Sequence, residues 1–201
     1  MNKIYLTATS NHYLYSTLSS LPNFLDYHSN MILDPDQILI DFSLTPKDEK
    51  LNFLSKNAQN IFSDLTLYDH RKIIIRGKFS SVFPSPQKRL EVVADAADQA
   101  MITDFFQQLE LKPIFVKDPG FSFIFPRILV QIINEACFAL EEKVASEKDI
   151  DTAMLFGVNY PVGPMSWGKE AGLSNVKFLL NELYHMTRDE RYRLSKSLEQ
   201  I

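Results

Sequence analysis

Cysteine and glycine are scarce in this sequence, and each scarcity excludes a class of protein. Cys137 is the single cysteine among 201 residues, so no intrachain disulfide can form and a reducing compartment such as the cytoplasm is expected. The six glycines all follow residue 76. A phosphate-binding loop brings its backbone close to the phosphate through glycines at fixed spacing, so the first 76 residues contain neither a Gly-x-Gly-x-x-Gly turn nor a P-loop.

Excess positive charge and long apolar runs are also missing. Lysine and arginine total 21 against 25 aspartates and glutamates, a formal net charge of −4, which argues against nucleic acid as the main partner. No apolar run is long enough to span a bilayer, and the first residues lack the apolar core of a signal peptide, so no membrane partner is expected. No metal site is expected, because the four histidines lie far apart without ligand spacing: His12, His28, His70 and His185.

Up to residue 117, strand and helix patterns alternate. Apolar and β-branched runs predict strands at residues 3–7, 37–42, 73–75, 90–93 and 113–116. Helices are predicted at residues 13–21, after Thr45-Pro46, and at 97–109; the second has Leu51, Leu54, Ala58 and Ile61 at helical spacing. This alternation is typical of an α/β layer with a parallel sheet.

Beyond Asp118-Pro119-Gly120 the sequence predicts helices only. A long helix is predicted at residues 127–144, a capping box at Ser146–Asp149 begins the next, and further starts fall at Pro164, Ser174 and Thr187–Glu190. The predicted plan is α/β followed by all-α, with a shortened Rossmann-like domain at 1–117 and an all-helical domain at 118–201. The long helix carries an apolar face that would be buried within the subunit or across a dimer contact: Leu129, Ile132, Ile133, Ala136 and Leu140.

Several motifs in this helical region resemble the C-terminal domain of 3-hydroxyacyl-CoA dehydrogenases. They are Val116-Lys117-Asp118-Pro119-Gly120-Phe121, Asn134-Glu135-Ala136, Glu141–Ser146, Asp149–Met154 and Gly157–Pro164. Upstream, residues 37–42 are similar to the family's fourth strand and residues 88–93 to its MKLVEVV segment. The resemblance implies an oxidoreductase of fatty-acid metabolism, with an NAD-binding Rossmann domain and a helical domain that dimerises and helps to close over the acyl-CoA. It also implies a histidine–glutamate pair that handles the proton on the C3 oxygen of the substrate.

The sequence departs from the family at the positions that carry this chemistry. Phe79 stands at the position of the histidine, and a phenyl ring cannot take a proton. Val82 and Pro126 stand at two asparagine positions, so Glu91 is the one catalytic candidate retained, with a structural role as acceptor for Arg89 or Lys88 as the alternative. The N-terminal region lacks the dinucleotide fingerprint and is short for the first half of a Rossmann fold. No cofactor, and no cofactor-binding residue, is therefore expected.

Other conspicuous residues are expected to be structural. His70 follows Asp69 and precedes a predicted strand, which favours a turn histidine over a displaced base. Thr66 lies near the serine of the family's NTSS turn, while Cys137 falls on an apolar helix stripe and Trp167 is typical of a packing anchor. The basic residues of 188–196 are expected on a solvated helix face, with contact to a CoA phosphate as the alternative.

Three functional hypotheses follow from these residues. The first is a degenerate 3-hydroxyacyl-CoA dehydrogenase homologue without NAD-dependent turnover, acting as an acyl-CoA or small-ligand binding or interaction protein and forming a homodimer through its helices. The second is an active oxidoreductase of the family with atypical cofactor binding. The third is different chemistry on acyl-CoA thioesters, with Glu91 as acid or base. Fold similarity does not choose among them, because function resides in the site.

Overall fold

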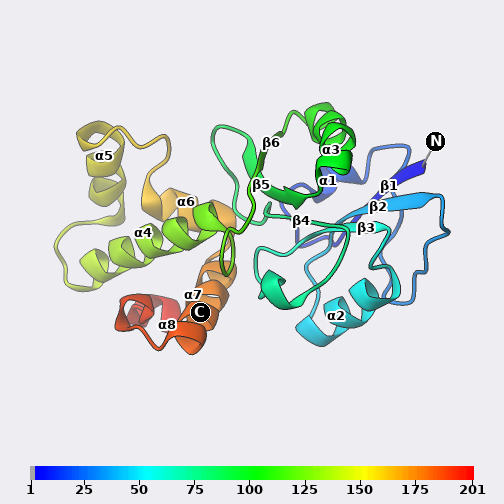
Figure 1. Cartoon of the computed structure of the whole chain (residues 1–201). Coiled ribbons are helices and arrows are strands. Elements are labelled where there is room, and N and C mark those ends of the chain that lie inside the picture. The colour runs from blue at the N-terminus through cyan, green and yellow to red at the C-terminus, as the bar shows by residue number, and fades with distance from the viewer. Residues whose placement is uncertain (1–2) are drawn as a thin grey trace. The chain divides into compact units, whose positions relative to one another are not determined.

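The computed structural model describes residues 3–201, which form two compact units. The sheet unit comprises the chain up to Val82 together with Lys88–Ser122, and the helical unit comprises Phe83–Gln87 and Phe123–Ile201 (Figure 1). The fold class predicted from the sequence, α/β followed by all-α, is confirmed. The predicted domain division after residue 117 stays a prediction.

One six-stranded sheet forms the centre of the sheet unit, with its strands in sequence order. Strands β1 to β4 are parallel, β5 is antiparallel to β4, and β6 is parallel to β5. The strands are β1 (Lys3–Ala8), β2 (Gln37–Phe42), β3 (Ile61–Asp64), β4 (Gly77–Phe79), β5 (Arg89–Ala94) and β6 (Lys112–Phe115). The helical segments are α1 (Tyr15–Leu18), α2 (Lys47–Lys56), the 3-10 turn η1 (His70–Lys72) and α3 (Ala96–Gln108).

Helices α2 and α3 lie on opposite faces of this sheet (Figure 1). Both faces are therefore buried, which explains why β2 and β3 have buried side chains at nearly every position rather than an alternating pattern. The larger apolar cluster is on the α3 face and contains alternate strand residues: Leu6, Ile38, Ile40, Phe42, Phe62, Phe79, Leu90 and Val92, with Ile102, Phe105 and Phe106 of the helix.

The outer edge of β1 is covered by the chain that follows it. The amide of Leu6 donates to Asn23 O (3.1 Å), Leu25 N donates to Leu6 O (2.8 Å), and the Asn23 side chain donates to Ile4 O (3.0 Å). These bonds satisfy backbone groups that an open edge strand would leave unpaired. At the opposite edge, β6 contains Pro113, which has no N–H and is tolerated on an edge strand.

Two strand predictions differ from the structure. Residues 73–75 form no strand, because the chain passes from η1 into an extended loop in which Ile74 is 90% exposed. Ile61 was predicted in the helix after Pro46, but it begins β3. The strand that pairs with β3 is β4, at residues 77–79 rather than at the predicted 73–75. Gly77 permits that pairing: a Cβ there would lie 2.1 Å from the ring of Phe62 on β3.

The helical unit is built around α4. Its elements are α4 (Ile124–Glu141), α5 (Glu147–Gly157), α6 (Pro164–Ala171), α7 (Leu173–Thr187), the 3-10 turn η2 (Glu190–Tyr192) and α8 (Lys196–Glu199). Ser146 caps α5 as predicted and Pro164 begins α6, whereas the predicted start at 187–190 leads only into η2. Across residues 3–201, no helix has the length and apolar character that crossing a membrane requires.

The family-like motifs of this unit hold helices together. The Asn134 side chain donates to Arg193 O (2.8 Å) and accepts from Ser195 N (3.0 Å), which fixes the late segment against α4. The carboxylate of Asp151 on α5 accepts from Met165 N (2.7 Å) and Ser166 N (3.0 Å) at the start of α6. The contacts of Asp151 satisfy two backbone amides in the first turn of α6, which have no partner within the helix.

Candidate functional site

The carboxyl ends of β1 to β4 meet at one edge of the sheet, which is where open parallel sheets bind ligands. Asp64 ends β3 there, and its side chain is fully buried. Its carboxylate accepts from the amides of Thr66 (2.8 Å) and Ser81 (2.9 Å) and from both of their hydroxyls. Burial alone would raise the pKa of Asp64, but the imidazole of His12 and these hydroxyls outweigh it and lower the pKa.

The imidazole of His12 has its proton on Nε2, because Nδ1 accepts from Leu14 N (3.1 Å). Nε2 therefore donates to the Ser81 hydroxyl at 3.1 Å, and that hydroxyl donates to Asp64. A serine nucleophile needs an imidazole that accepts its proton, which is the opposite arrangement. His12, Ser81 and Asp64 thus connect the ends of β1, β3 and β4 rather than forming a nucleophilic triad.

A second buried polar group lies on the other face of the same edge. Lys50 of α2 donates from Nζ to Asp41 Oδ2 (2.6 Å), to Ser43 O (2.7 Å) and to the Ser43 hydroxyl (3.1 Å). Ser63 of β3 donates to the same carboxylate oxygen at 2.7 Å. All three ammonium protons have acceptors, and both charged side chains are fully buried. The arrangement fixes the loop after β2 and exposes no reactive atom.

Phe79, which the resemblance in sequence predicts at the position of the family's histidine, lies in the apolar core. Its ring packs 4.9 Å from that of Phe42 and 5.2 Å from that of Phe106, and it has no exposed surface. Glu91 on β5 is also buried, with 7% exposure. Because Phe79 pairs with Val92 and strand side chains alternate, the Glu91 side chain projects from the opposite face of the sheet. The structure does not bring these two positions together, and the catalytic role of Glu91 stays a prediction.

The other singled-out residues of the sheet unit are buried and hydrogen-bonded or packed. His70 bonds through Nε2 to the carbonyl of Gly120, and burial lowers the pKa of His70 despite that bond. Thr66 belongs to the Asp64 cluster, and its carbonyl accepts from the Ser122 hydroxyl at 2.8 Å. Val82 is 3% exposed. These contacts agree with the structural interpretation of His70.

In the helical unit, three singled-out residues are part of the packing. Cys137 is 3% exposed, and burial raises the pKa of its thiol. Trp167 is 6% exposed; its indole N–H donates to Pro84 O (2.9 Å), which explains why residues 83–87 belong to this unit. Pro126 lies buried in α4. The basic residues of 188–196, predicted on one helix face, lie instead in η2 and in the chain around it. The guanidinium carbon of Arg193 lies 4.9 Å from the centre of the Phe138 ring.

Sequence reasoning missed the Asp64 cluster. The sequence does not predict Asp64 as a strand-end residue, because Ile61 follows the helical spacing of the segment before it, and His12 stands alone without a partner at ligand spacing. An acidic residue directly after the run Ile61-Phe62-Ser63 was the available signal. No group of three metal-ligating side chains occurs among residues 3–201.

The turn after β1 is where Rossmann domains present glycines and a helix N-terminus to a dinucleotide. Here Leu44 N donates to the Thr9 hydroxyl (2.8 Å), and the Asn11 amide donates to Leu44 O (3.1 Å). Side chains bonded to the neighbouring loop thus occupy this turn, and α1 after it has only four residues. These residues do not fit the usual pyrophosphate contacts, so a dinucleotide would have to be held by other groups.

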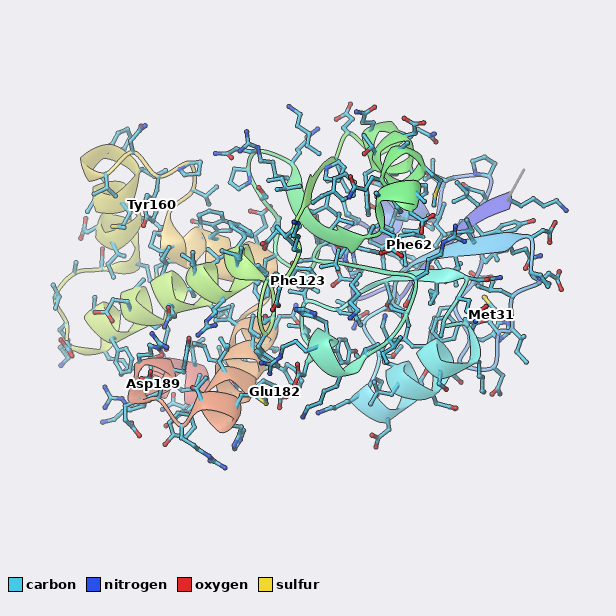
Figure 2. The ribbon with its side chains drawn as sticks, in the orientation of Figure 1. Met31, Phe62, Phe123, Tyr160, Glu182 and Asp189 are labelled. Atoms are coloured by element: carbon cyan, nitrogen blue, oxygen red, sulfur yellow. The ribbon has the colours of Figure 1, made fainter. Side chains whose placement is uncertain are left out.

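A groove of about 750 Å³ lies along α4 in the helical unit. Tyr160, after α5, lines one side, and Glu190 and Arg191 of η2 line the other; Figure 2 shows Tyr160 and Asp189 on either side of α4. Ile128 on the helix is 53% exposed. Of the predicted apolar face, Leu129, Ile133 and Ala136 are buried within the unit, whereas Ile132 and Leu140 are half-buried.

Comparison with known proteins identifies relatives of both units. The family described as 3-hydroxyacyl-CoA dehydrogenase, C-terminal domain, matches residues 122–201. The chain is 51% identical over 74 residues to 3-hydroxyadipyl-CoA dehydrogenase of Escherichia coli K12, covering 37% of this chain and 16% of that protein. It is 33% identical over 115 residues to 3-hydroxybutyryl-CoA dehydrogenase of Clostridioides difficile, covering 54% of this chain and 40% of that one.

A solved structure extends the likeness across the fold. The (S)-3-hydroxybutyryl-CoA dehydrogenase of Ralstonia eutropha matches with a TM-score of 0.66 and 25% identity, covering 89% of this chain and 68% of that one. The chain thus matches well under two thirds of the length of the two curated relatives named above.

These relatives overturn one expectation from the sequence, that no cofactor is involved. They are named dehydrogenases, and a dehydrogenase needs a hydride acceptor such as NAD, so the missing glycine motif was not sufficient ground for that expectation. The motif order, the family match at residues 122–201 and the shared fold lead to one assignment. Residues 122–201 match the C-terminal domain of the 3-hydroxyacyl-CoA dehydrogenase family, and the fold of the chain as a whole is similar to that of these dehydrogenases.

Proposed function

We propose that this dehydrogenase-like protein does not turn over 3-hydroxyacyl-CoA and acts as an acyl-CoA or small-ligand binding or interaction protein. The observation that carries the proposal is the position of Phe79, fully buried between the rings of Phe42 and Phe106. Oxidation of a secondary alcohol requires a base within hydrogen-bond reach of the hydroxyl. A phenyl ring in a packed core offers neither a proton acceptor nor a path for the substrate.

The neighbouring polar groups support the same proposal. Asp64, His12 and Ser81 satisfy one another, and their side chains are buried. Glu91 projects from the other face of the sheet from Phe79. An imidazole that already donates through Nε2 and accepts through Nδ1 would have to break a buried hydrogen bond before it could act as a base.

A turnover assay tests the proposal directly. The full chain is incubated at high concentration with acetoacetyl-CoA and NADH, with the Clostridioides difficile 3-hydroxybutyryl-CoA dehydrogenase as a positive control. We expect no rate above that of the same mixture without protein, because proton transfer to the C3 oxygen lacks its histidine. Measurable turnover would contradict the proposal, and its loss in the Glu91→Gln variant would establish the alternative, an active oxidoreductase.

Acyl-CoA binding is tested separately from turnover. A ligand that binds only the folded protein raises its unfolding temperature with concentration. We expect acetyl-, butyryl- and octanoyl-CoA to produce concentration-dependent shifts of different size, whereas free adenosine produces none. If no acyl-CoA changed the unfolding temperature, the acyl-CoA part of the proposal would be wrong, and only the role as an interaction protein would remain.

The groove along α4 supports a homodimer through the helical unit as part of this proposal. Its lining combines apolar side chains such as Ile132 and Met154 with Glu135 and Glu142 on one side and Arg191 on another. A two-fold interface places the same patch on both subunits, so opposite charges within one patch can meet across it.

A cytoplasmic location completes the proposal. It is supported by Cys137, a free and buried thiol and the single cysteine of the chain. Cell fractionation with an antibody to the full chain tests this point.

A further inference from the structure

A second groove, of about 460 Å³, lies in the sheet unit where β5 and β6 end and β4 begins. Its volume is within the range of pockets that hold small molecules. The lining combines cationic and apolar side chains: Arg76, Lys78, Lys117, Ile75, Val93 and Phe115. None of these residues belongs to the Asp64 cluster or to the groove along α4.

Lys78 on β4 is the residue that points to a ligand. Its ammonium donates to His70 O at 2.6 Å, and among residues 3–201 no carboxylate forms an ion pair with it. Asp69 lies nearby but is engaged by Arg71 through two hydrogen bonds. Burial lowers the pKa of Lys78. A half-buried ammonium has three protons to donate, so two remain for another acceptor.

The remaining charges of the groove also favour an anion. Arg76 is held by Asp98 through two hydrogen bonds (3.0 and 2.7 Å), which fixes it without leaving a free charge. Lys117 is exposed and has no ion pair in the described chain, and Asp95 is the one acidic residue in the lining. Two ammonium groups without an ion pair, those of Lys78 and Lys117, therefore stand against one carboxylate in the lining.

Half-buried apolar side chains complete the groove. Ile75 precedes β4, Val93 is on β5 and Phe115 ends β6, and all three are half-buried. An apolar segment of a ligand would cover this surface and remove it from water. An anion without an apolar part would leave it exposed.

From this combination, we propose that the groove binds a small amphiphilic anion. A phosphate or carboxylate head group accepts from Lys78 and Lys117, and a short apolar tail covers Ile75, Val93 and Phe115. Charge-assisted hydrogen bonds give the head group its selectivity, and burial of the tail adds affinity. This inference is independent of the proposed acyl-CoA role and concerns a different groove from the proposed dimer surface.

Calorimetric titration of the full chain with four probes tests the site. We expect n-hexyl phosphate and hexanoate to bind, inorganic phosphate to bind more weakly, and hexanol not to bind. A stronger response to hexyl phosphate identifies a phosphate ester as the natural head group, and a stronger response to hexanoate identifies a carboxylate. Hexanol binding as tightly as hexanoate would overturn the proposal.

Two variants assign the site to these residues. Lys78→Met keeps the length of the side chain and should weaken hexyl phosphate binding about tenfold or more, the loss expected for one charge-assisted hydrogen bond. Lys112→Met removes an equal charge from the exposed start of β6 and should leave binding unchanged. Should Lys78→Met not fold, the exposed Lys117→Gln variant decides. Unchanged binding in the folded variant refutes the proposal.

Discussion

Asp64 carries a negative charge in a place with no exposed surface. An isolated buried carboxylate would be strongly unfavourable, but this one accepts two amide and two hydroxyl hydrogen bonds. Because the bonds come from Thr66 and Ser81, the charge holds the ends of β3 and β4 in one arrangement. A buried polar group of this kind stabilises a unique packing only while all its members are satisfied.

The acid dependence of stability should therefore include Asp64. Its folded-state pKa is lowered, whereas its unfolded value is about 3.9. The contribution to the free energy of unfolding is fully present above that unfolded value and is lost as pH falls through the lower folded value. Urea unfolding at pH 7 and at several points down to pH 3 should show Asp64→Asn destabilised by about 3 kcal/mol at pH 7 and less sensitive to acid.

Asp36→Asn provides the control for that series. The Asp36 carboxylate is exposed and pairs with Lys3 at 3.8 Å, a surface contact that contributes about 0–1 kcal/mol. Its unfolding curves should follow those of the unmodified chain. Equal acid sensitivity of the Asp64→Asn and unmodified chains would show that the buried cluster does not depend on the charge.

Position 163 requires glycine because the side chain of Asp151 lies close to it, and not because of its backbone angles. Its φ is −68°, which any residue adopts, but a Cβ there would lie 2.3 Å from Cγ of Asp151. That carboxylate cannot easily move, because it caps α6 through Met165 and Ser166. Gly163→Ala should lower the free energy of unfolding by about 1–3 kcal/mol, as overpacking does.

The matched substitution is Gly157→Ala, where a Cβ would have no neighbour within 4 Å. It should be neutral or slightly stabilising, since alanine has the higher helix propensity at the end of α5. Thermal unfolding of both variants measures the difference. Indistinguishable unfolding temperatures would show that Asp151 yields without cost.

At the scale of elements, sequence patterns predicted the long helices and strand β2, but they did not predict the short strand β4. Strand β2 and the helices α3, α5 and α6 were predicted within a few residues, because apolar periodicity and capping residues define long elements. The three-residue strand β4 has no comparable pattern: it consists of Gly77, Lys78 and Phe79, and its place is set by pairing with β3. The isoleucine run at 73–75 was more strand-like, but lies in an extended loop.

The two edges of the sheet should differ in amide hydrogen exchange. On β1, Leu6 donates to Asn23 O, and Leu25 donates back to Leu6 O. On β6, Lys112 and Val116 donate to β5, so the alternation of a parallel strand directs the Phe115 amide outward. Exchange followed by NMR should show protection at Leu6 and Leu25 similar to that at Leu39 of β2, and rapid exchange at Phe115. Rapid exchange at Leu6 would indicate an open β1 edge.

At the scale of the whole molecule, the sequence predicted the family and the fold class but not what fills the sheet edge. The motifs around Asn134 and Asp151 were recognisable because each is a local sequence with a structural task. The Asp64 cluster joins residues 12, 64 and 81, and no local pattern connects positions so far apart. The cofactor expectation failed for a related reason, because it equated one absent motif with an absent cofactor.

The proposed homodimer gives the last prediction. Ile128 is 53% exposed on α4 and lines the groove of the helical unit, so a second copy would cover it. Sedimentation equilibrium should give twice the mass of one chain, and Ile128→Glu should give a single-chain mass with unchanged circular dichroism, because the interface would bury an unpaired carboxylate. Ile74→Glu is the control: Ile74 is 90% exposed in the sheet unit and does not line the groove, and this variant should remain dimeric. A single-chain mass for the unmodified protein at high concentration would contradict the homodimer while leaving the Phe79 argument against turnover untouched.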